Sequence, residues 1–228
     1  TRFPGKALAL LAGRPMVEHT YNRARASGAD LVLVATDHPA IREAVEAFGG
    51  RAVMTRSDHP SGTDRIWEAI QGETCDLVVN VQGDEPLIPT SVIDELIAAM
   101  RQHPEDDMGT VAVPASREAM VDPNKVKVVF GANGRALYFS RSVIPFLREG
   151  GEDAPVYLHW GLYAYRYEAL RRFVHLPPSR LENCEKLEQL RALEDGMSIR
   201  VLVSELESIG VDTPADLVRA EAKIKSLK

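Results

Sequence analysis

The chain has little cysteine, no long hydrophobic run and no excess of positive charge, and each of these excludes a class of protein. Its two cysteines, Cys75 and Cys184, lie far apart and form no CxxC pair, as is typical of reduced thiols in a cytoplasmic protein. No apolar run approaches the length that crosses a membrane, and the first residues lack the pattern of a signal peptide. We therefore expect a cytoplasmic protein with no membrane partner.

The charges and glycines exclude further classes. The net charge is −6 and the two signs are interspersed, whereas a protein that binds nucleic acid needs a basic patch. A small anionic substrate would therefore need positive side chains placed locally. No G-x-G-x-x-G motif occurs, which disfavours a dinucleotide-dependent oxidoreductase. Lys6 is not part of a P-loop, because Ala7 follows it and the upstream glycine is absent.

The order of the expected elements indicates an α/β fold. A chain of 228 residues can bury one large core, and we predict a single domain over residues 1–228. Strands and helices alternate at short intervals, which is typical of a doubly wound, mostly parallel sheet. The expected helices cover residues 16–26, 39–48, 91–102 and 181–194, and the expected strands cover residues 31–34, 51–54, 77–81, 110–114 and 199–203.

The alternation of strands and helices stops over about residues 120–180, and we interpret this segment as an antiparallel insertion within the domain. Residues 126–130 and 135–140 flank Asn133-Gly134, a strong signal for a β-hairpin. Residues 158–165 alternate like another strand. The insertion therefore adds antiparallel strands to a mostly parallel sheet.

The sequence LVVNVQGDEPLIP at residues 77–89 predicts a strand buried on both faces that ends in Gly83 and Asp84. In open α/β sheets, ligands bind at the carboxyl ends of the strands. Asp84 is either a hard oxygen ligand of the kind that Mg²⁺ prefers or a cap for the next helix. Ser91 and Asp94 already give that helix an S-x-x-D capping pattern, which leaves Asp84 available.

A second aspartate, Asp212, is likewise not needed to cap a helix. Thr213 can cap the last helix and Pro214 fits its first turn, so Asp212 is not needed there. Asp84 and Asp212 each lie in a loop that follows a strand. We therefore expect the two carboxylates to share one divalent metal ion.

Two further segments carry groups suited to phosphate or other polar ligands. Arg2 and Lys6 flank a Pro-Gly turn, whose cations and backbone N–H groups can hold a phosphate chain, although such turns are also common on surfaces. Ser61-Gly62-Thr63 begins a helix just before Arg65, and the free N–H groups of a helix N-terminus suit polar ligand atoms. An ordinary helix cap by Ser61 or Thr63 explains the same residues equally well.

A series of short motifs follows in order along nearly the whole chain. They are R-x-P-G-K (2–6), A-T-D (35–37), S-G-T-D-R (61–65), V-N-V-Q-G-D-E-P (79–86), N-x-V-K-V-V (124–129), A-L-Y-F-S-R (136–141), H-x-G-x-Y-x-Y-R (159–166), L-E-Q-L-R (187–191) and G-V-D-T-P (210–214). Together they resemble the 3-deoxy-manno-octulosonate (Kdo) cytidylyltransferases, also called CMP-Kdo synthetases. Sialic-acid-activating relatives share the fold and the early phosphate loop but differ in the sugar half.

This resemblance implies a nucleotide-diphospho-sugar transferase-like fold and the reaction CTP + Kdo → CMP-Kdo + pyrophosphate, an early step of lipopolysaccharide biosynthesis. It also implies Mg²⁺ as the cofactor and a homodimer, with the insertion forming the sugar pocket and the dimer contacts. Activation of a related acidic sugar, such as 8-amino-Kdo or a sialic-type acid, is the alternative.

The resemblance also implies roles for individual residues. Lys6, Asp84 and Asp212 are catalytic, and the two aspartates hold the metal. Arg2 and Lys6 hold the CTP phosphates. The residues around the nucleotide are Ser61, Gly62 and Arg65, and Gln82 touches the sugar. The residues that line the Kdo pocket are Arg141, His159, Tyr163, Glu185 and Gln189.

Elementary chemistry agrees with these roles. Kdo is a carboxylate, and Arg141 offers a bidentate fork to it. In-line attack of the anomeric hydroxyl on the α-phosphate needs positioning and charge neutralisation more than a protein nucleophile. His159 is either a general base or a hydrogen-bonding group, and we favour the second role. Tyr163 and Tyr165 are expected on opposite faces of a strand, one facing the ligand and the other in the core.

Members of the family have a strand and a small-residue loop with another arginine before the position of Thr1. We therefore expect the natural chain to have further N-terminal residues. Two other classes stay open. A metal-dependent sugar transferase usually carries two aspartates close together after one strand, and a non-catalytic nucleotide-binding protein needs no spare metal carboxylates.

Overall fold

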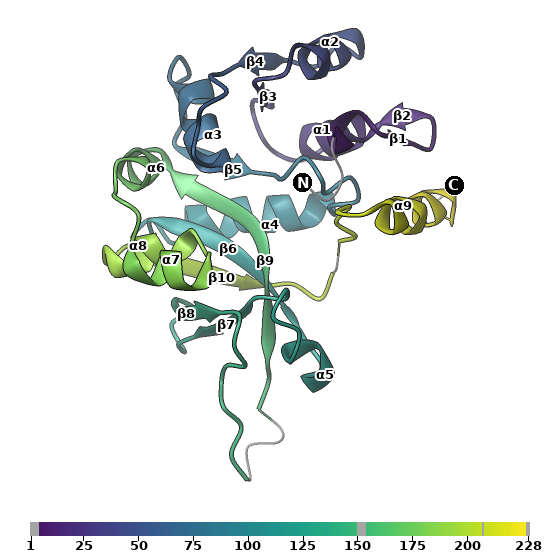
Figure 1. The fold of residues 1–228 in the computed structure, drawn as a ribbon. Coiled ribbons are helices and arrows are strands. Elements are labelled where there is room, and N and C mark those ends of the chain that lie inside the picture. The colour runs from purple at the N-terminus through teal and green to yellow at the C-terminus, as the bar shows by residue number, and fades with distance from the viewer. Residues whose placement is uncertain (1–4, 150–153, 207, 227–228) are drawn as a thin grey trace. The chain divides into compact units, whose positions relative to one another are not determined.

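A computed structural model describes residues 5–149, 154–206 and 208–226 (Figure 1). The chain divides into two compact units. Unit 1 consists of Thr1–Thr74, Asn80–Asp94 and Glu207–Lys228, and unit 2 consists of Cys75–Val79 and Glu95–Leu206. Both units combine strands with helices, so the α/β prediction is confirmed.

Unit 1 pairs short parallel strands and packs helices against them. In this pair, Val34 lies opposite Ala52 and Thr36 lies opposite Met54. Thr55 continues the pairing by donating its N–H to the Thr36 carbonyl at 2.9 Å. The elements are η1 (Lys6–Leu8), β1 (Leu10–Leu11), β2 (Arg14–Pro15), α1 (Met16–Arg25), β3 (Val34–Thr36), α2 (Pro39–Ala47), β4 (Ala52–Met54), α3 (Gly62–Ile70) and α9 (Pro214–Ser226).

In unit 1, α1, α2 and β4 follow the sequence expectation, whereas η1, β1 and β2 were not predicted and β3 differs in position. Pro39 opens α2 in its first turn, and Gly49 with a φ of +80° follows its end. The strand expected at residues 31–34 is wrong in position, because β3 begins only at Val34. Its partner β4 is three residues long and offers pairing only from Val34 onward.

A mixed sheet forms the centre of unit 2. Its order is β10-β6-β9-β7-β8, and β5 also pairs with β9. β10 and β6 are parallel, whereas β9 runs antiparallel to both β6 and β7. Burial along β5 alternates, with Val78 and Asn80 buried, so the expected burial on both faces is wrong. The strands are β5 (Leu77–Asn80), β6 (Met108–Pro114), β7 (Lys127–Phe130), β8 (Ala136–Ser140), β9 (Tyr157–Arg166) and β10 (Ile199–Val203).

The predicted hairpin is confirmed. β7 and β8 pair antiparallel, with Lys127 opposite Ser140. Gly134 has a φ of +73° in the turn between them, a conformation that glycine adopts without strain. The hairpin thus has a turn end near Gly134 and an open end at Lys127 and Ser140.

The single helix expected over residues 181–194 is wrong, because two helices occupy this stretch. α7 ends at Glu185, Lys186 takes a left-handed φ of 55°, and α8 begins at Gln189. Cys184, on α7, is exposed. The helices are α4 (Thr90–Gln102), α5 (Arg117–Met120), α6 (Tyr167–Val174), α7 (Arg180–Glu185) and α8 (Gln189–Glu194).

The start of α4 also differs from the expectation. α4 begins at Thr90, so Ser91 lies inside its first turn and does not precede it. The Asp94 carboxylate accepts a hydrogen bond from the Gly28 N–H at 2.6 Å. The capping pair expected from Ser91 and Asp94 is therefore wrong. Whether Asp84 is available depends on its own contacts.

Close packing fixes the interior of unit 2. A Cβ built on Gly109 of β6 would lie 2.8 Å from Met100 Sδ and 3.0 Å from Leu96 Cδ1, so α4 approaches the strand where glycine leaves room. Both apolar side chains are fully buried. Within the described ranges, the helices are all too short or too polar to cross a membrane.

Candidate functional site

Three charged residues from distant parts of the chain meet in unit 1. Lys6 Nζ donates to the Asp84 carboxylate and to Asp212 Oδ1, the second bond being 3.2 Å long. Lys6 opens η1 directly after Gly5, whose φ of +68° turns the chain. Asp84 follows β5, and Asp212 precedes α9. The structure thus brings Lys6, predicted for phosphate binding, together with the two aspartates predicted for metal binding.

Local hydrogen bonds place the two aspartates. Val211 donates its N–H to the Asp84 carbonyl at 2.9 Å, so the two loops run side by side. Thr213 caps α9 by accepting the Asp216 N–H at 3.2 Å, and the Asp216 carboxylate accepts the Thr213 N–H at 2.9 Å. The helix therefore does not use the Asp212 carboxylate, and the Asp212 side chain is 69% exposed.

The carboxylates of this cluster stabilise the charged form of Lys6. Burial by itself lowers the pKa of Lys6, but the hydrogen bonds and charges of Asp84 and Asp212 outweigh it, so the pKa lies above its usual value. The ammonium group stays charged and reduces the repulsion between the two carboxylates, although one negative charge of the cluster is left uncompensated. Two carboxylates that converge on one cation form a donor set that fits Mg²⁺, which takes oxygen ligands.

The Ser61 hydroxyl is engaged in capping α3. It accepts the N–H groups of Thr63 and Asp64, both at 3.2 Å, and donates to the Asp64 carboxylate at 2.6 Å. The alternative of an ordinary helix cap therefore describes the Ser61 contacts. Gly62 faces open space, because a Cβ there would have no neighbour within 4 Å among the described residues.

Arg65 holds the carboxyl ends of two parallel strands. Its Nη1 donates to Thr55 Oγ1 after β4 at 2.8 Å and lies 3.2 Å from Asp37 Oδ1 after β3. The carboxyl edge of a parallel sheet is where ligands bind. The guanidinium therefore lies at this edge of the sheet, with its own donors partly engaged.

The turn that carries Asp84 is held by its neighbours. Gln82 donates from Nε2 to Oδ1 of the buried Asn80 at 3.1 Å. The Gln82 carbonyl accepts the Glu85 N–H at 3.1 Å, which closes the turn. Arg2, expected to share the phosphate site with Lys6, lies outside the described residues.

In unit 2, Arg141 and Glu185 meet at the open end of the hairpin. The Glu185 carboxylate accepts the Arg141 N–H at 2.9 Å and the Ser140 hydroxyl at 2.6 Å. The Arg141 guanidinium donates to the carbonyls of Glu185 at 2.7 Å, Pro123 at 3.1 Å and Lys186 at 3.5 Å. A guanidinium has five N–H donors. Among the described residues, one N–H on each terminal nitrogen is left for a ligand.

His159 lies on β9 as a neutral imidazole. Its Nε2 is 3.0 Å from Thr110 Oγ1, and the Thr110 hydroxyl donates to the Leu162 carbonyl at 2.9 Å, so Nε2 carries the proton. Burial lowers the pKa of His159 to about 3. The ring also packs edge-on against Phe139, with 4.9 Å between centroids. This arrangement favours the hydrogen-bonding role over that of a general base.

Tyr163 and Tyr165 lie on the same face of β9, and the expectation of opposite faces is wrong. Residues two apart along a strand point the same way, and these ring centroids are 5.9 Å apart. Tyr165 is 2% exposed and belongs to the core, as expected for one of the two. Tyr163 is partly exposed, and burial raises the pKa of its phenol well above the usual value.

Gln189 carries the least satisfied polar group of the expected sugar pocket. It begins α8 and is 5% exposed. Its Nε2 has no hydrogen-bond partner in the part of the chain that the structure describes. An unmet buried donor costs about 1–3 kcal/mol, and such groups normally bind a ligand or water. The Gln189 amide therefore fits a pocket that is completed by a bound molecule.

Three residues of this region were missed from the sequence. Ser140 donates to Glu185, Thr110 orients His159, and Lys127 is entirely buried at the start of β7. A lysine inside an apolar strand was an available signal for Lys127. Nothing near Thr110 in the sequence marks it, because its partner lies 49 positions further along the chain.

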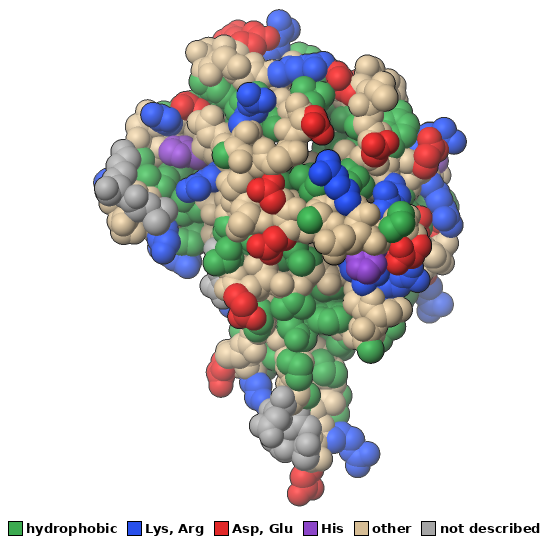
Figure 2. Space-filling view, turned by 180° about the vertical axis from the view of Figure 1, so that it is seen from behind, with side chains coloured by type: hydrophobic (Ala, Val, Ile, Leu, Met, Phe, Trp, Pro, Cys, Tyr) green, Lys and Arg blue, Asp and Glu red, His purple; other side chains and the backbone are tan. Residues whose placement is uncertain are grey.

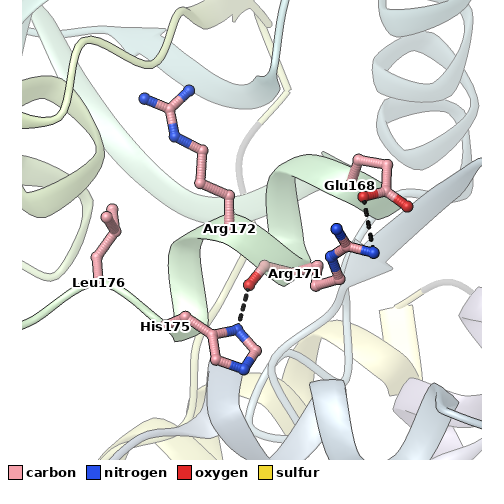
Figure 3. A pocket seen from close by; sticks show the side chains of 5 residues that line it. All are labelled: Glu168, Arg171, Arg172, His175 and Leu176. Carbon is pink, nitrogen blue, oxygen red and sulfur yellow. Dashed lines mark hydrogen bonds and ion pairs between the residues drawn. The ribbon is translucent and has the colours of Figure 1, made fainter.

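A pocket along α6 contains none of the predicted site residues (Figure 3). Arg171 pairs with Glu168 at 3.3 Å, and Arg172 pairs with Asp195 at 2.5 Å. Figure 3 shows the Arg171 side chain directed at Glu168 and the His175 ring directed at the Arg171 carbonyl. The arginines are already neutralised, so this pocket is a poor candidate for an anionic substrate.

The chain is similar to known proteins over nearly its whole length. Residues 1–199 match the family described as Cytidylyltransferase. The 3-deoxy-manno-octulosonate cytidylyltransferase of Syntrophobacter fumaroxidans is 51% identical over 95% of this chain and 89% of its own. The 8-amino-3,8-dideoxy-manno-octulosonate cytidylyltransferase of Shewanella halifaxensis is 50% identical over 98% of this chain and 94% of its own.

Solved structures give the same result for the fold. A CMP:2-keto-3-deoxy-manno-octonic acid synthetase complexed with CTP superposes with a TM-score of 0.96 at 42% identity, covering 100% of this chain and 95% of its own. A nucleotidyl transferase from Methanothermobacter superposes with a TM-score of 0.62 at 15% identity, covering 98% of this chain and 86% of its own. The predicted nucleotide-diphospho-sugar transferase-like fold is confirmed.

Proposed function

This chain belongs to the cytidylyltransferase family, and on that premise we propose that it activates Kdo with CTP to give CMP-Kdo and pyrophosphate. It is a nucleotidyltransferase whose product feeds lipopolysaccharide biosynthesis. The observation that carries the proposal is the TM-score of 0.96, over the entire chain, to a CMP-Kdo synthetase complexed with CTP.

The groups of unit 1 bind the nucleotide. Lys6 and Arg2 hold the phosphates, and the Lys6 ammonium stays charged because of its two carboxylate neighbours. The N-terminus of α3 faces the nucleotide at Gly62, where space is open. Ser61 fixes that helix end by capping it, and Arg65 keeps the adjacent strand ends together.

Asp84 and Asp212 are the residues that would hold a divalent metal, and Mg²⁺ fits their oxygen donors. Their convergence on the Lys6 ammonium supports this assignment, because it shows that one cation can satisfy both. When bound, the metal supplies neutralisation of the phosphate charge that develops during transfer.

The groups of unit 2 bind the sugar acid. Arg141 uses its two remaining N–H groups for the Kdo carboxylate. Glu185 fixes the position of Arg141, because its carboxylate accepts the Arg141 backbone N–H and its carbonyl accepts Arg141 Nε–H. Gln189 donates its unmet amide hydrogen to the sugar. His159 and Tyr163 line the pocket in neutral form. The anomeric hydroxyl then attacks the α-phosphate in line, and pyrophosphate leaves.

The choice between Kdo and its 8-amino analogue is a narrower question. An 8-amino-Kdo cytidylyltransferase is 50% identical to this chain, against 51% for a Kdo enzyme. Both sugars carry the carboxylate that Arg141 binds and the hydroxyl that attacks CTP. The second candidate function is therefore CMP transfer to 8-amino-Kdo by the same residues.

The chain acts as a cytoplasmic homodimer. Several large apolar side chains of the antiparallel segment are exposed, namely Val121 at 72%, Leu137 at 65% and Phe146 at 83%. Figure 2 shows hydrophobic side chains gathered in the lower part of the view, at the level where Figure 1 shows β7 and β8. Apolar side chains exposed in this way suit a contact between two copies. Analytical ultracentrifugation should give twice the monomer mass, whereas a monomer at micromolar concentration would contradict the dimer.

The test is a product assay with purified protein, CTP and Mg²⁺. Kdo, 8-amino-Kdo and a sialic acid are added separately, and pyrophosphate and the CMP-sugar are measured. We expect turnover with Kdo and none without a sugar or after removal of divalent metal by a chelator. Release of pyrophosphate with neither Kdo nor 8-amino-Kdo would overturn the proposal. Consumption of added CMP-Kdo without CTP would instead indicate a sugar transferase.

A further inference from the structure

Lys127 is a lysine with no exposed surface, and the proposed reaction gives it no task. Its Nζ donates to the carbonyls of Asp122 at 3.1 Å, Lys125 at 2.7 Å and Arg141. These bonds use all three donors of an ammonium group. A buried charge held only by backbone carbonyls is rare, because burial strongly disfavours charged groups. Burial indeed lowers the pKa of Lys127, while the charges of Asp122 and Glu185 act in the opposite direction.

The three carbonyls belong to two segments at the open end of the hairpin. Asp122 and Lys125 lie in the loop before β7, and Arg141 directly follows β8. The ammonium therefore ties this loop to the backbone of Arg141. The same loop supplies the Pro123 carbonyl that accepts a hydrogen bond from Arg141 Nη1 at 3.1 Å.

Arg141 is consequently fixed at every polar position except the two N–H groups assigned to the sugar carboxylate. Glu185 holds its backbone N–H, and Lys127 holds its backbone carbonyl. Pro123 and Glu185 hold its guanidinium through their carbonyls. Loss of the Lys127 ammonium would release both the Arg141 carbonyl and the loop that orients the guanidinium.

We propose that Lys127 is a positioning residue for Arg141, which it holds in the orientation that binds the carboxylate of the sugar acid. This inference rests on the proposed function, because it assumes that Arg141 binds that carboxylate. Lys127 touches no substrate. It acts through Arg141 alone, so its effect is confined to the sugar side of the reaction.

A matched control lies at the turn end of the same hairpin. Asp106 is also fully buried and binds Arg135 Nε at 2.5 Å and Arg200 Nε at 2.6 Å. Asp106→Asn removes a buried charge from the same unit without touching Arg141. It separates loss of positioning from general loss of stability.

The experiment is a double-mutant cycle with steady-state kinetics and isothermal titration of CTP. We expect Lys127→Met to raise KM for Kdo about tenfold or more, to change kcat less than about threefold, and to leave the Kd for CTP unchanged. In the Arg141→Ala background, the same change should raise KM by less than about twofold. Asp106→Asn should lower Tm and leave KM for Kdo unchanged. Lys127→Gln keeps N–H donors but removes the charge. It replaces Lys127→Met if that variant fails to fold, and it should raise KM for Kdo by a smaller factor.

Two outcomes overturn the proposal. If the free-energy effects of Lys127→Met and Arg141→Ala on KM for Kdo were fully additive in the double variant, Lys127 would not act through Arg141. An equal rise in KM for Kdo in Asp106→Asn would show a general effect of stability. These outcomes differ from failure of the proposed function, in which the wild-type protein itself forms no CMP-Kdo or CMP-8-amino-Kdo.

Discussion

The candidate residues of unit 1 and those of unit 2 are held in opposite ways. In unit 1, Lys6 of η1 and the loop residues Asp84 and Asp212 have charged side chains that bind chiefly one another, and Asp212 is 69% exposed. In unit 2, Arg141 is held by backbone carbonyls and by Glu185, and Gln189 is 5% exposed. The first set is an adaptable group of charges, and the second is a preformed set of hydrogen bonds.

The difference fits the two kinds of ligand. Phosphates and metal ions carry high charge, and a cluster of opposite charges on loops can bind them in several geometries. A sugar acid is distinguished from its analogues by the placement of polar atoms, which requires side chains that are fixed before binding. This difference supports the proposal that unit 1 supplies charge for the chemical step and that unit 2 selects the sugar.

The largest effect is expected from the carboxylates of unit 1. Asp84→Asn and Asp212→Asn should each lower kcat by about 10³-fold or more, because neutralisation of the phosphates through the metal is lost. The fold should persist, since neither side chain caps a helix. Pyrophosphate release and circular dichroism measure the two effects. Asp30→Asn, a change at an exposed aspartate of the same unit, is the control and should be silent. Near-normal turnover of either variant at low Mg²⁺ would rule out the shared metal.

A smaller effect, confined to the nucleotide, is expected from Lys6. Lys6→Ala should weaken CTP binding by about 10- to 100-fold, as expected when a charge-assisted hydrogen bond is lost, and should slow the chemical step. KM for Kdo should stay within about threefold of the wild-type value. Isothermal titration with CTP and steady-state kinetics measure both, with Lys223→Ala on the exposed side of α9 as control. Unchanged CTP affinity in Lys6→Ala would remove Lys6 from the phosphate site.

The neutral state of His159 predicts a pH dependence of stability instead of activity. The unfolded chain protonates this residue below its ordinary pKa of 6.5, whereas the folded chain does so only near pH 3. Its contribution to the free energy of unfolding is therefore complete above pH 6.5 and is lost progressively as the pH falls toward 3. His159→Gln should flatten that slope in urea titrations. If His159 were a general base, the wild-type rate would instead show a pKa near neutrality that His159→Gln abolishes.

The smallest effect compares one helix cap from each unit. Ser61 caps α3, and Ser179 caps α7 in a capping box with Glu182. Ser61→Ala and Ser179→Ala should each lower the free energy of unfolding by about 1 kcal/mol. Aspartate restores a cap at both positions, but only Ser61→Asp should weaken CTP, because it adds negative charge beside the phosphates. Equal CTP affinity in Ser61→Asp and Ser179→Asp would place the nucleotide away from α3.

Local signals in the sequence predicted much of the fold. The Asn133-Gly134 turn, the helical spacing of α1 and the apolar run of β10 each correspond to an observed element. The break between α7 and α8 had no such signal, because Lys186 adopts a left-handed conformation that usually marks glycine or asparagine. Spacing of leucines continues across the break, so periodicity alone predicts one helix.

The candidate site was predictable in part. Asp84 and Asp212 were identified by asking which acids the helix ends did not need, and this reasoning holds for Asp212, since Thr213 and Asp216 cap α9. For Asp84 the same reasoning assumed that Ser91 and Asp94 cap the next helix. That premise is wrong, because the Asp94 carboxylate binds the Gly28 N–H instead. The pairing of Arg141 with Glu185 joins residues 44 positions apart and was not predicted; resemblance to a family implied only that both line the sugar pocket.

The division into a nucleotide side and a sugar side is tested most directly by Arg141→Ala. The measurement is the Kd of this variant for CTP alone, by isothermal titration, beside its KM for Kdo. An arginine that pairs with a carboxylate in a partly closed pocket contributes about 2–4 kcal/mol, so KM for Kdo should rise about 30- to 1000-fold while the Kd for CTP stays unchanged. If Arg141→Ala lost CTP affinity as severely as Lys6→Ala, Arg141 would be a phosphate clamp and the division would be wrong.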